Sequence, residues 1–318
     1  MFSKFTTRNA PQLFDVLSPY FYSIFLIGNT LNRTVTPAAT TVGKLVLPGV
    51  SPIPTLNTTS DILTPENIAL VSWFVPFKSA SPTLTCLYNG SINGFSMNQF
   101  EVHVCKYPAP TLLLLLVERQ TTATPTMGRR QKAQKERMIL GAYVTETWKV
   151  SKSGWGNDSF ALFELSPCFE VFPAKNGASS GLNNRHYVHF LKNAGVGFGG
   201  QESESCMLYM DDNLRYGNYR QDFAGGNVYM SAGGARQSGF EVDFEIVECE
   251  VWGLGGPEAK ARQQKDWDFE QREANRRATV HLRSKDGEQD IDRDLLEMAG
   301  VIDPDRGHRH ARRQSAAS

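Results

Sequence analysis

The stretch Gly195–Gly200 has the sequence GVGFGG, which satisfies the G-x-G-x-x-G pattern of loops that cradle the phosphates of a dinucleotide. That chemistry needs a strand before the glycines and a helix after them, so that the helix N-terminus faces the phosphate. Here the glycines precede QESESCMLYM, a polar loop that runs into a strand, and no strand–helix–strand unit is visible. We therefore expect close backbone packing within a sheet instead of nucleotide binding.

Two polar groups have spacings that resemble metal sites. His186 and His189 are three residues apart, and on a strand such residues point to opposite faces, so they cannot share a metal. Asp211-Asp212-Asn213 resembles the start of a calcium loop, but the glycine and the terminal glutamate are missing at the required offsets. We predict a turn after a strand at this position and expect no metal site.

Three glutamates, Glu245, Glu248 and Glu250, lie near the end of one predicted strand, where a pair of carboxylates could act as general acid and base. The sequence has no G-x-S-x-G or Cys–His signature that would supply a nucleophile. The cysteines are dispersed and form no C-x-x-C, which favours buried thiols in a reducing compartment over disulfides or a zinc site. They are Cys86, Cys105, Cys168, Cys206 and Cys249. We expect no catalytic residue, no metal and no cofactor.

The composition excludes several classes of protein. A length of 318 residues suggests two domains of ~150 residues each, and 41% apolar residues suffice for a sizeable core. Lys plus Arg and Asp plus Glu are both 33, and this zero net charge argues against a protein that coats nucleic acid or an anionic membrane. The longest apolar runs, Tyr20–Ile27 and Thr111–Val117, are far shorter than the ~20 residues of a membrane span.

The segment from Met138 to Gly256 repeatedly predicts strands, separated by Gly, Asn, Ser or Asp turns. The clearest is Phe240–Trp252, where apolar and acidic residues alternate and the phase slips at Ile246-Val247, which predicts a bulge or bend. Further strands are expected at Thr111–Val117, Met138–Val144, Ser159–Leu165, Phe169–Phe172, His186–Leu191 and Ser205–Met210. So many strands of antiparallel type indicate a sandwich.

Helices and loops are predicted around these strands. Residues 1–80 form a helical and loop region, in which Thr30–Thr64 resembles an extended linker. Thr64 is the expected N-cap of a helix over Pro65–Phe74. A capping box in Ser96–Gln99 predicts a short helix from Met97 to Cys105. The basic stretch within Glu118–Arg137 is expected to be a solvated surface loop, with a nuclear-import or phosphate-binding patch as the alternative.

The segment Pro257–Ser318 is dense in charges of both signs. Glu258–Arg277 lacks an internal Pro or Gly and predicts one solvated helix, Asp290–Ala299 predicts a second, and the end is expected to be disordered. Large aromatics on a polar helix are typical interface anchors, and arginines around them can pair with acidic partner helices. We therefore predict a partner-binding site at Arg262, Trp267, Phe269, Arg272 and Arg276. The alternative is that Trp267 packs back onto the sandwich.

A series of short motifs in a fixed order resembles the TLDc domain family over Ser81–Gly256. The motifs are LYNGSINGFSMNQF, YPAPTLLLL, LGAYVTETWK, FLKNAGVGFGG, LYMDDNLRYG and FEIVECEVWG. The flanking SPYFYSIFL, VSPIPTL and WDFEQREANRRATVHL resemble the fungal restriction-of-telomere-capping branch of that family, which has an mTOR-associated lysosomal branch in animals. The division that follows is a helical and loop region at 1–80, a TLDc domain at 81–256 and a charged helical tail at 257–318.

The resemblance implies an α+β, β-rich fold, in which a two-sheet antiparallel β-sandwich carries short flanking helices and a C-terminal charged helix. It also implies a non-enzymatic regulatory protein that binds the peripheral sector of the vacuolar proton-pumping ATPase and affects its assembly, with a link to oxidative-stress resistance. Such a protein would be a cytoplasmic monomer, associated peripherally with the vacuole or lysosome membrane. The alternatives are a lysosomal or vacuolar signalling adaptor, or an enzyme with a cryptic pocket around Gly195–Gly200.

Overall fold

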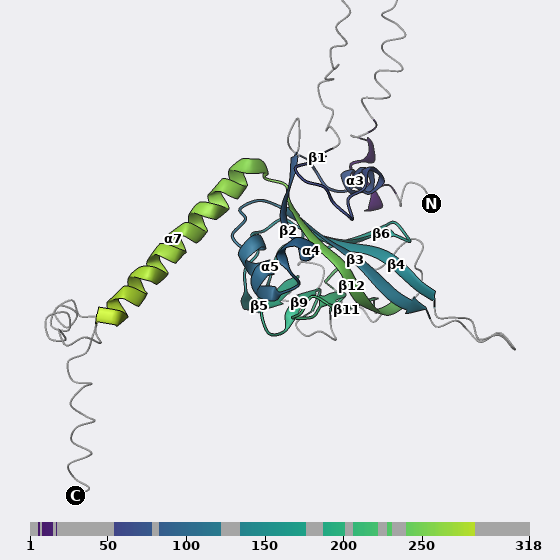
Figure 1. Ribbon diagram of the computed structural model, residues 1–318. Coiled ribbons are helices and arrows are strands. Elements are labelled where there is room, and N and C mark those ends of the chain that lie inside the picture. Colours follow the sequence, from purple (N-terminus) through teal and green to yellow (C-terminus); the bar gives the residue numbers. More distant parts are fainter. Residues whose placement is uncertain are drawn as a thin grey trace, which may run out of the picture. The chain divides into compact units, whose positions relative to one another are not determined.

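The computed structural model describes residues 6, 8–14, 17, 54–77, 83–121, 134–175, 187–200, 206–221, 228–230 and 240–283 (Figure 1). The chain divides into two compact units, Met1–Gln263 and Gln264–Ser318. The first unit contains all the described strands and the short helices. The predicted second helix at Asp290–Ala299, the tail after it and most of the N-terminal helical stretch lie outside the described residues.

One sheet runs through the first unit in the order β5–β8–β9–β10–β11–β12–β3–β4–β6–β7, and every pair on this path is antiparallel. One half of the path consists of β5 (Ser151–Trp155), β8 (Val188–Leu191), β9 (Gly195–Phe198), β10 (Leu208–Met210) and β11 (Tyr216–Gln221). The other half consists of β12 (Phe240–Gly253), β3 (Thr111–Thr121), β4 (Gln134–Val144), β6 (Ala161–Ser166) and β7 (Glu170–Pro173). Off this path, β2 (Thr83–Asn89) pairs with β12 and, in parallel, with β1 (Thr55–Leu56).

This single sheet folds over itself into two layers. Strands β7 and β11 are separated by four strands along the path, yet Phe172 of β7 and Tyr219 of β11 have ring centroids 6.3 Å apart. Ala174, directly after β7, forms an isolated bridge with Tyr229. The β-rich antiparallel sandwich is therefore confirmed, with hydrogen bonding that continues from one layer into the other. The strands predicted from the sequence are also confirmed, with boundaries shifted by a few residues.

Aromatic rings fill part of the first unit's core beneath helix α5 (Met97–Val104). Phe100 of α5 meets Trp148 at 5.5 Å and Phe190 at 5.7 Å, and Trp148 meets Phe198 at 6.1 Å, all edge to face. Each such pair adds about 0.5–1.5 kcal/mol beyond the burial of its area. The Trp148 indole N–H donates to Thr111 Oγ1 at 2.7 Å, so its polar atom is satisfied inside the core. Helix α5 begins where predicted, but the capping box is wrong, because Ser96 makes no side-chain capping bond.

A second hydrophobic core lies on the outer face of β12, β3, β4 and β6, beneath residues 54–77. Helix α3 (Pro65–Ser72) begins after Thr64, whose hydroxyl accepts from the Asn67 amide as predicted. The rings of Phe74 and Phe163 are 4.9 Å apart. The buried members are Ile62, Leu63, Ile68, Val71, Phe74, Val75, Leu84, Leu112, Leu114, Tyr143, Phe163, Leu165, Val171 and Trp252. For residues 54–64 the linker expectation is therefore wrong, because their apolar side chains cover the sheet.

The predicted bulge in β12 is confirmed between Ile246 and Glu248, where the register with β3 shifts. Figure 1 shows β12 running through the middle of the sheet, beside β3 and β2. Glu245 pairs with Glu118, and after the bulge Glu248 pairs with Leu116, so both glutamates lie on the outer face. The bulge therefore keeps the acidic residues of β12 on one face, although their spacing in the sequence slips.

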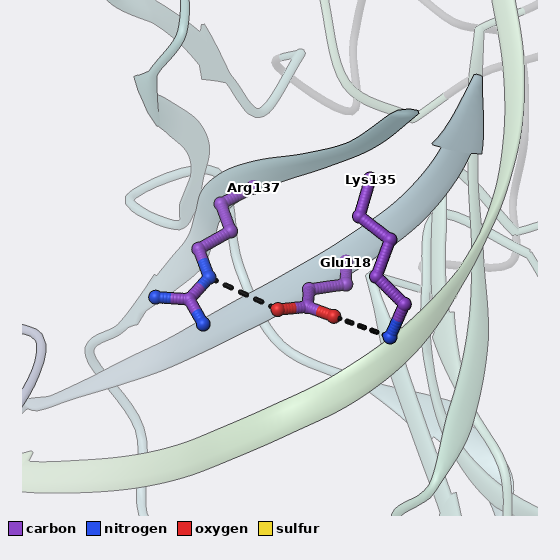
Figure 2. Close-up of polar contacts among 3 residues, drawn as sticks. All are labelled: Glu118, Lys135 and Arg137. Carbon is purple, nitrogen blue, oxygen red and sulfur yellow. Dashed lines mark hydrogen bonds and ion pairs between the residues drawn. The ribbon is translucent and has the colours of Figure 1, made fainter. Parts of the chain in front are cut away.

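The prediction of a surface loop over Glu118–Arg137 is wrong at both ends of that range. Strand β3 continues to Thr121 and β4 begins at Gln134, and the two strands pair with each other. Figure 2 shows Glu118 accepting from Lys135 Nζ at 2.9 Å and from Arg137 Nε at 3.0 Å across the two strands. Arg119 and Glu136 pair directly opposite each other. Opposite charges across a ladder favour strand pairing, which the sequence pattern of basic residues did not reveal. Arg129, Arg130 and Lys132 lie outside the described residues.

Helix α7 (Gly256–Arg283) confirms and extends the helix predicted at Glu258–Arg277. It is long, but its mean hydropathy is low, and among the described residues no helix is long and apolar enough to span a membrane. The domain boundary at residue 81 stays a prediction. The second core includes residues on both sides of that position.

Shortening Phe74 tests whether residues 54–77 belong to the folded core. Phe74→Ala should lower the free energy of unfolding by about 3–5 kcal/mol, because the buried ring contacts Phe163 and leaves a cavity. Ile92→Ala is the control, since this side chain is 80% exposed and should change stability by no more than about 0.5 kcal/mol. Urea unfolding of both variants measures the difference. Equal effects would show that the segment packs without contributing to stability.

Candidate functional site

The first four residues of the glycine-rich stretch form β9, and their backbone packs closely in the sheet. A Cβ on Gly197 would lie 2.1 Å from His189 Cε1 and 2.5 Å from Cys206 Sγ. Gly195 has a φ of +83°, and a Cβ there would lie 2.0 Å from the Met210 carbonyl oxygen. The prediction of backbone packing is therefore confirmed, and the space that a phosphate would need is filled by side chains.

A Cys–His pair, which the sequence did not reveal, lies beside these glycines. Cys206 Sγ is 3.7 Å from His189 Nδ1, and both residues are buried. His189 Nδ1 is 3.0 Å from the Gly200 carbonyl oxygen, which can only accept, so this nitrogen carries the proton and is no base for the thiol. Burial raises the pKa of Cys206 to about 12, so the thiol is protonated at neutral pH. The pair lacks the features of a catalytic dyad.

The turn predicted at Asp211-Asp212-Asn213 is confirmed, because Asp211 Oδ1 accepts from the amides of Arg215 at 2.7 Å and Tyr216 at 3.1 Å. These contacts close the turn between β10 and β11. His189 lies on β8, whereas His186 lies outside the described residues. Among the side chains that the structure describes, no group of three or more His, Cys, Asp or Glu could hold a metal ion.

Glu250 is fully buried and accepts three hydrogen bonds. Ser60 Oγ donates at 2.5 Å, the Asp61 amide at 3.0 Å and the Trp252 indole N–H at 2.8 Å. Burial raises the pKa of Glu250 above its ordinary value, and the three donors partly oppose this rise. The carboxylate therefore ties the segment that begins the second core to β12.

Glu248 has a similar role toward helix α4 (Gly90–Asn93). It accepts from the Ser91 amide at 3.2 Å, from the Ser91 hydroxyl, and from the Cys249 amide at 2.8 Å. Glu245 is exposed on the other side of the bulge. The three predicted carboxylates thus divide into one surface residue and two acceptors for covering segments, and they form no acid–base pair. Their partners on the covering segments lie 157 to 190 residues away, so no local signal could have found those contacts.

The predicted partner-binding residues lie on α7, where the helical repeat separates them into two groups. Arg262, Phe269 and Arg276 recur every seven residues and share one face, with Arg272 beside them. Phe269 is 59% exposed. Trp267 instead continues the line of Ala259 and Gln263, spaced by four residues. The role of all five residues in partner binding stays a prediction.

The first turns of α7, up to Gln263, belong to the first compact unit and contact helix α5. Gln263 Nε2 donates to the carbonyl oxygens of Cys105 at 2.7 Å and His103 at 2.9 Å, which end helix α5. The buried Gln263 therefore satisfies two carbonyls that α5 itself leaves without a helical partner. Farther along α7, Arg276 pairs with Glu273 at 3.0 Å and Arg272 Nε donates to the Asp268 carbonyl at 3.1 Å. Such exposed contacts are weak and can be exchanged for a partner's.

The folded unit corresponds to a known domain. The sequence profile of the TLDc domain matches residues 56–255, so the chain belongs to the TLDc domain family. The resemblance seen in the ordered motifs is thereby confirmed. The match begins at β1 and ends just before α7, so it includes the segment that forms the second core.

Fungal relatives share more than this domain. The chain is 30% identical to a protein of Leptosphaeria maculans, and the alignment covers 93% of this chain and 54% of the relative. It is 31% identical to a protein of Colletotrichum graminicola, over 92% of this chain and 52% of that relative. It is 30% identical to a protein of Neurospora crassa, over 96% of this chain and 56% of that relative. Each of these relatives is called restriction of telomere capping protein 5. The chain spans about half the length of these curated relatives.

Replacing Glu250 by glutamine tests its role in holding the second core. Glu250→Gln should destabilise the fold by about 1–3 kcal/mol near pH 4.5, because an amide brings two hydrogens toward the donors Ser60, Asp61 and Trp252, whereas a protonated carboxyl group brings only one. The pKa of Glu250 is higher in the folded protein than in the unfolded chain. Its contribution to the free energy of unfolding is therefore complete below the unfolded-state pKa and is lost as pH rises through the folded-state pKa. The gap in free energy of unfolding between the unchanged protein and Glu250→Gln should therefore shrink as pH rises.

Urea unfolding over a pH series measures this gap. Glu258→Gln, at an exposed position on α7, is the matched control and should change stability by no more than about 0.5 kcal/mol at any pH. A gap that widens with pH would mean that the carboxylate is stabilised in its charged form.

Proposed function

We propose that this protein is a non-catalytic regulatory protein that binds the peripheral sector of the vacuolar proton-pumping ATPase through α7 and affects the assembly of that pump. Membership of the TLDc domain family supports a regulatory role. The observation that carries the proposed interface is the exposed Phe269 on one face of a charged helix, between Arg262 and Arg276. An exposed aromatic flanked by arginines is a typical anchor for a protein partner with an acidic surface.

The proposed setting follows from the proposed partner. A protein that binds the cytoplasmic part of this pump is itself cytoplasmic and associates peripherally with the vacuole or lysosome membrane. It acts as a monomer, and its link to oxidative-stress resistance runs through the pump. Nothing in this proposal requires a cofactor, a metal or nucleic acid.

Phe269→Ala tests the interface directly. The variant should reduce co-purification with the ATPase from vacuolar membranes by at least about tenfold, as the loss of a central anchor does, at an unchanged melting temperature. Gln271→Ala, an exposed polar position on the same helix, is the control and should leave both measurements unchanged. Full co-purification of Phe269→Ala would overturn the proposed interface.

Trp267→Ala separates the two interpretations of that residue. Reduced co-purification at unchanged stability would place Trp267 in the interface with Phe269. A lower melting temperature would instead support the alternative, in which Trp267 packs on its own protein and serves the fold.

A further inference from the structure

A groove of about 300 Å³ crosses the outer face of the sheet, where β10, β11 and β12 lie side by side. Most of its residues belong to the motif LYMDDNLRYG and to the three residues that follow it. The lining residues are Tyr209, Asp211, Tyr216, Gly217, Asn218, Arg220, Glu241 and Asp243. No step of the proposed function uses this groove.

Two tyrosines and a closely packed glycine belong to the lining of the groove. A Cβ on Gly217 would lie 2.3 Å from the Tyr209 carbonyl oxygen and 2.4 Å from the Phe244 ring, so this position must be glycine to pack closely here. The Tyr209 hydroxyl donates to the Ala194 carbonyl at 2.8 Å, which holds its ring in place. Tyr216 is 59% exposed and offers its ring to a ligand.

The charge of the groove is negative. It contains three carboxylates, Asp211, Glu241 and Asp243, and one guanidinium, that of Arg220. Arg220 and Glu241 are 3.9 Å apart, at the limit of an ion pair, and the Glu241 side chain is 65% exposed. Asp243 accepts from Asn218 Nδ2 at 2.8 Å, which orients its carboxylate at the surface. The lining of the groove therefore contains two more carboxylates than guanidinium groups.

The bulge in β12 separates this face from the covered part of the same sheet. Beyond it, Glu248 and Glu250 are buried beneath α4 and residues 60–61. Before it, Glu241, Asp243 and Glu245 are exposed. Within the part of the chain that the structure describes, the outer face of β10, β11 and the part of β12 before the bulge is thus left uncovered.

We propose that this groove binds an extended, lysine- or arginine-rich segment of a partner protein. Carboxylates at a partly enclosed surface attract cations more strongly than on an open one. The tyrosine rings offer their negative faces to the same ammonium or guanidinium groups. An anionic ligand such as nucleic acid would be repelled. The site lies on the sandwich and does not rest on the proposed role of α7.

The full chain can be titrated against fluorescein-labelled octalysine, with fluorescence anisotropy as the readout, at about 0.05 and 0.15 M salt. Glu241→Gln/Asp243→Asn should weaken binding about tenfold at the lower salt. Glu258→Gln/Asp266→Asn removes the same charge from exposed positions on α7 and should change binding by less than about twofold. Equal weakening by the two double variants would overturn the proposal, because attraction would then follow net charge alone.

Tyr216 tests whether the aromatic surface takes part. Tyr216→Ala should weaken octalysine binding about threefold to fivefold, whereas Tyr216→Phe keeps the ring and should bind as the unchanged protein does. Melting temperatures confirm that all the variants are folded. Unchanged binding by Tyr216→Ala, or binding of octaglutamate that depends on Glu241 and Asp243, would contradict a groove for basic segments.

Discussion

Val247 is an extra residue on β12 relative to β3, and the rest of the outer surface depends on it. Ile246 pairs with Val117, but the next residue of β3, Leu116, pairs with Glu248. Without this bulge, Glu248 and Glu250 would point between the two layers of the sandwich, and the buried Cys249 and Val251 would turn outward. The bulge therefore keeps Cys249 and Val251 in the interior and the acidic residues of β12 on the outer face.

That face has two different uses. Beyond the bulge, Glu250 accepts from Ser60, Asp61 and Trp252, and the second core closes around it. A buried carboxylate without donors would cost several kcal/mol, so this segment packs well only when its donors reach the glutamate. The carboxylates that most resemble catalytic groups in the sequence are thus structural acceptors. This explains why they occur without a nucleophile beside them.

The two proposed binding surfaces differ in chemistry and lie on different parts of the chain. The groove before the bulge is acidic and aromatic, whereas the Phe269 face of α7 carries arginines. The two proposals, an arginine-flanked anchor and an acidic groove, call for partner surfaces of opposite charge. Membership of the TLDc domain family and the names of the fungal relatives point to a regulatory protein. Within the first unit, Gln263 anchors the start of α7 to the end of α5.

Local patterns in the sequence were enough to predict β3, β4, β6, β7, β8, β10 and β12, the bulge at Ile246-Val247, and helices α3, α5 and α7, because each follows from the pattern of neighbouring residues. The shorter elements β1, β2, β5, β9, β11 and α4 were not predicted. They were not enough to reveal that Ser60 meets Glu250, that Cys206 meets His189, or that Glu118 closes a hairpin with Arg137. The groove likewise combines residues of β10 and β11 with Glu241 and Asp243 of β12. These contacts join parts of the chain that only the folding of the sheet brings together, so the residue types were present in the sequence but their partners were decided by the tertiary structure.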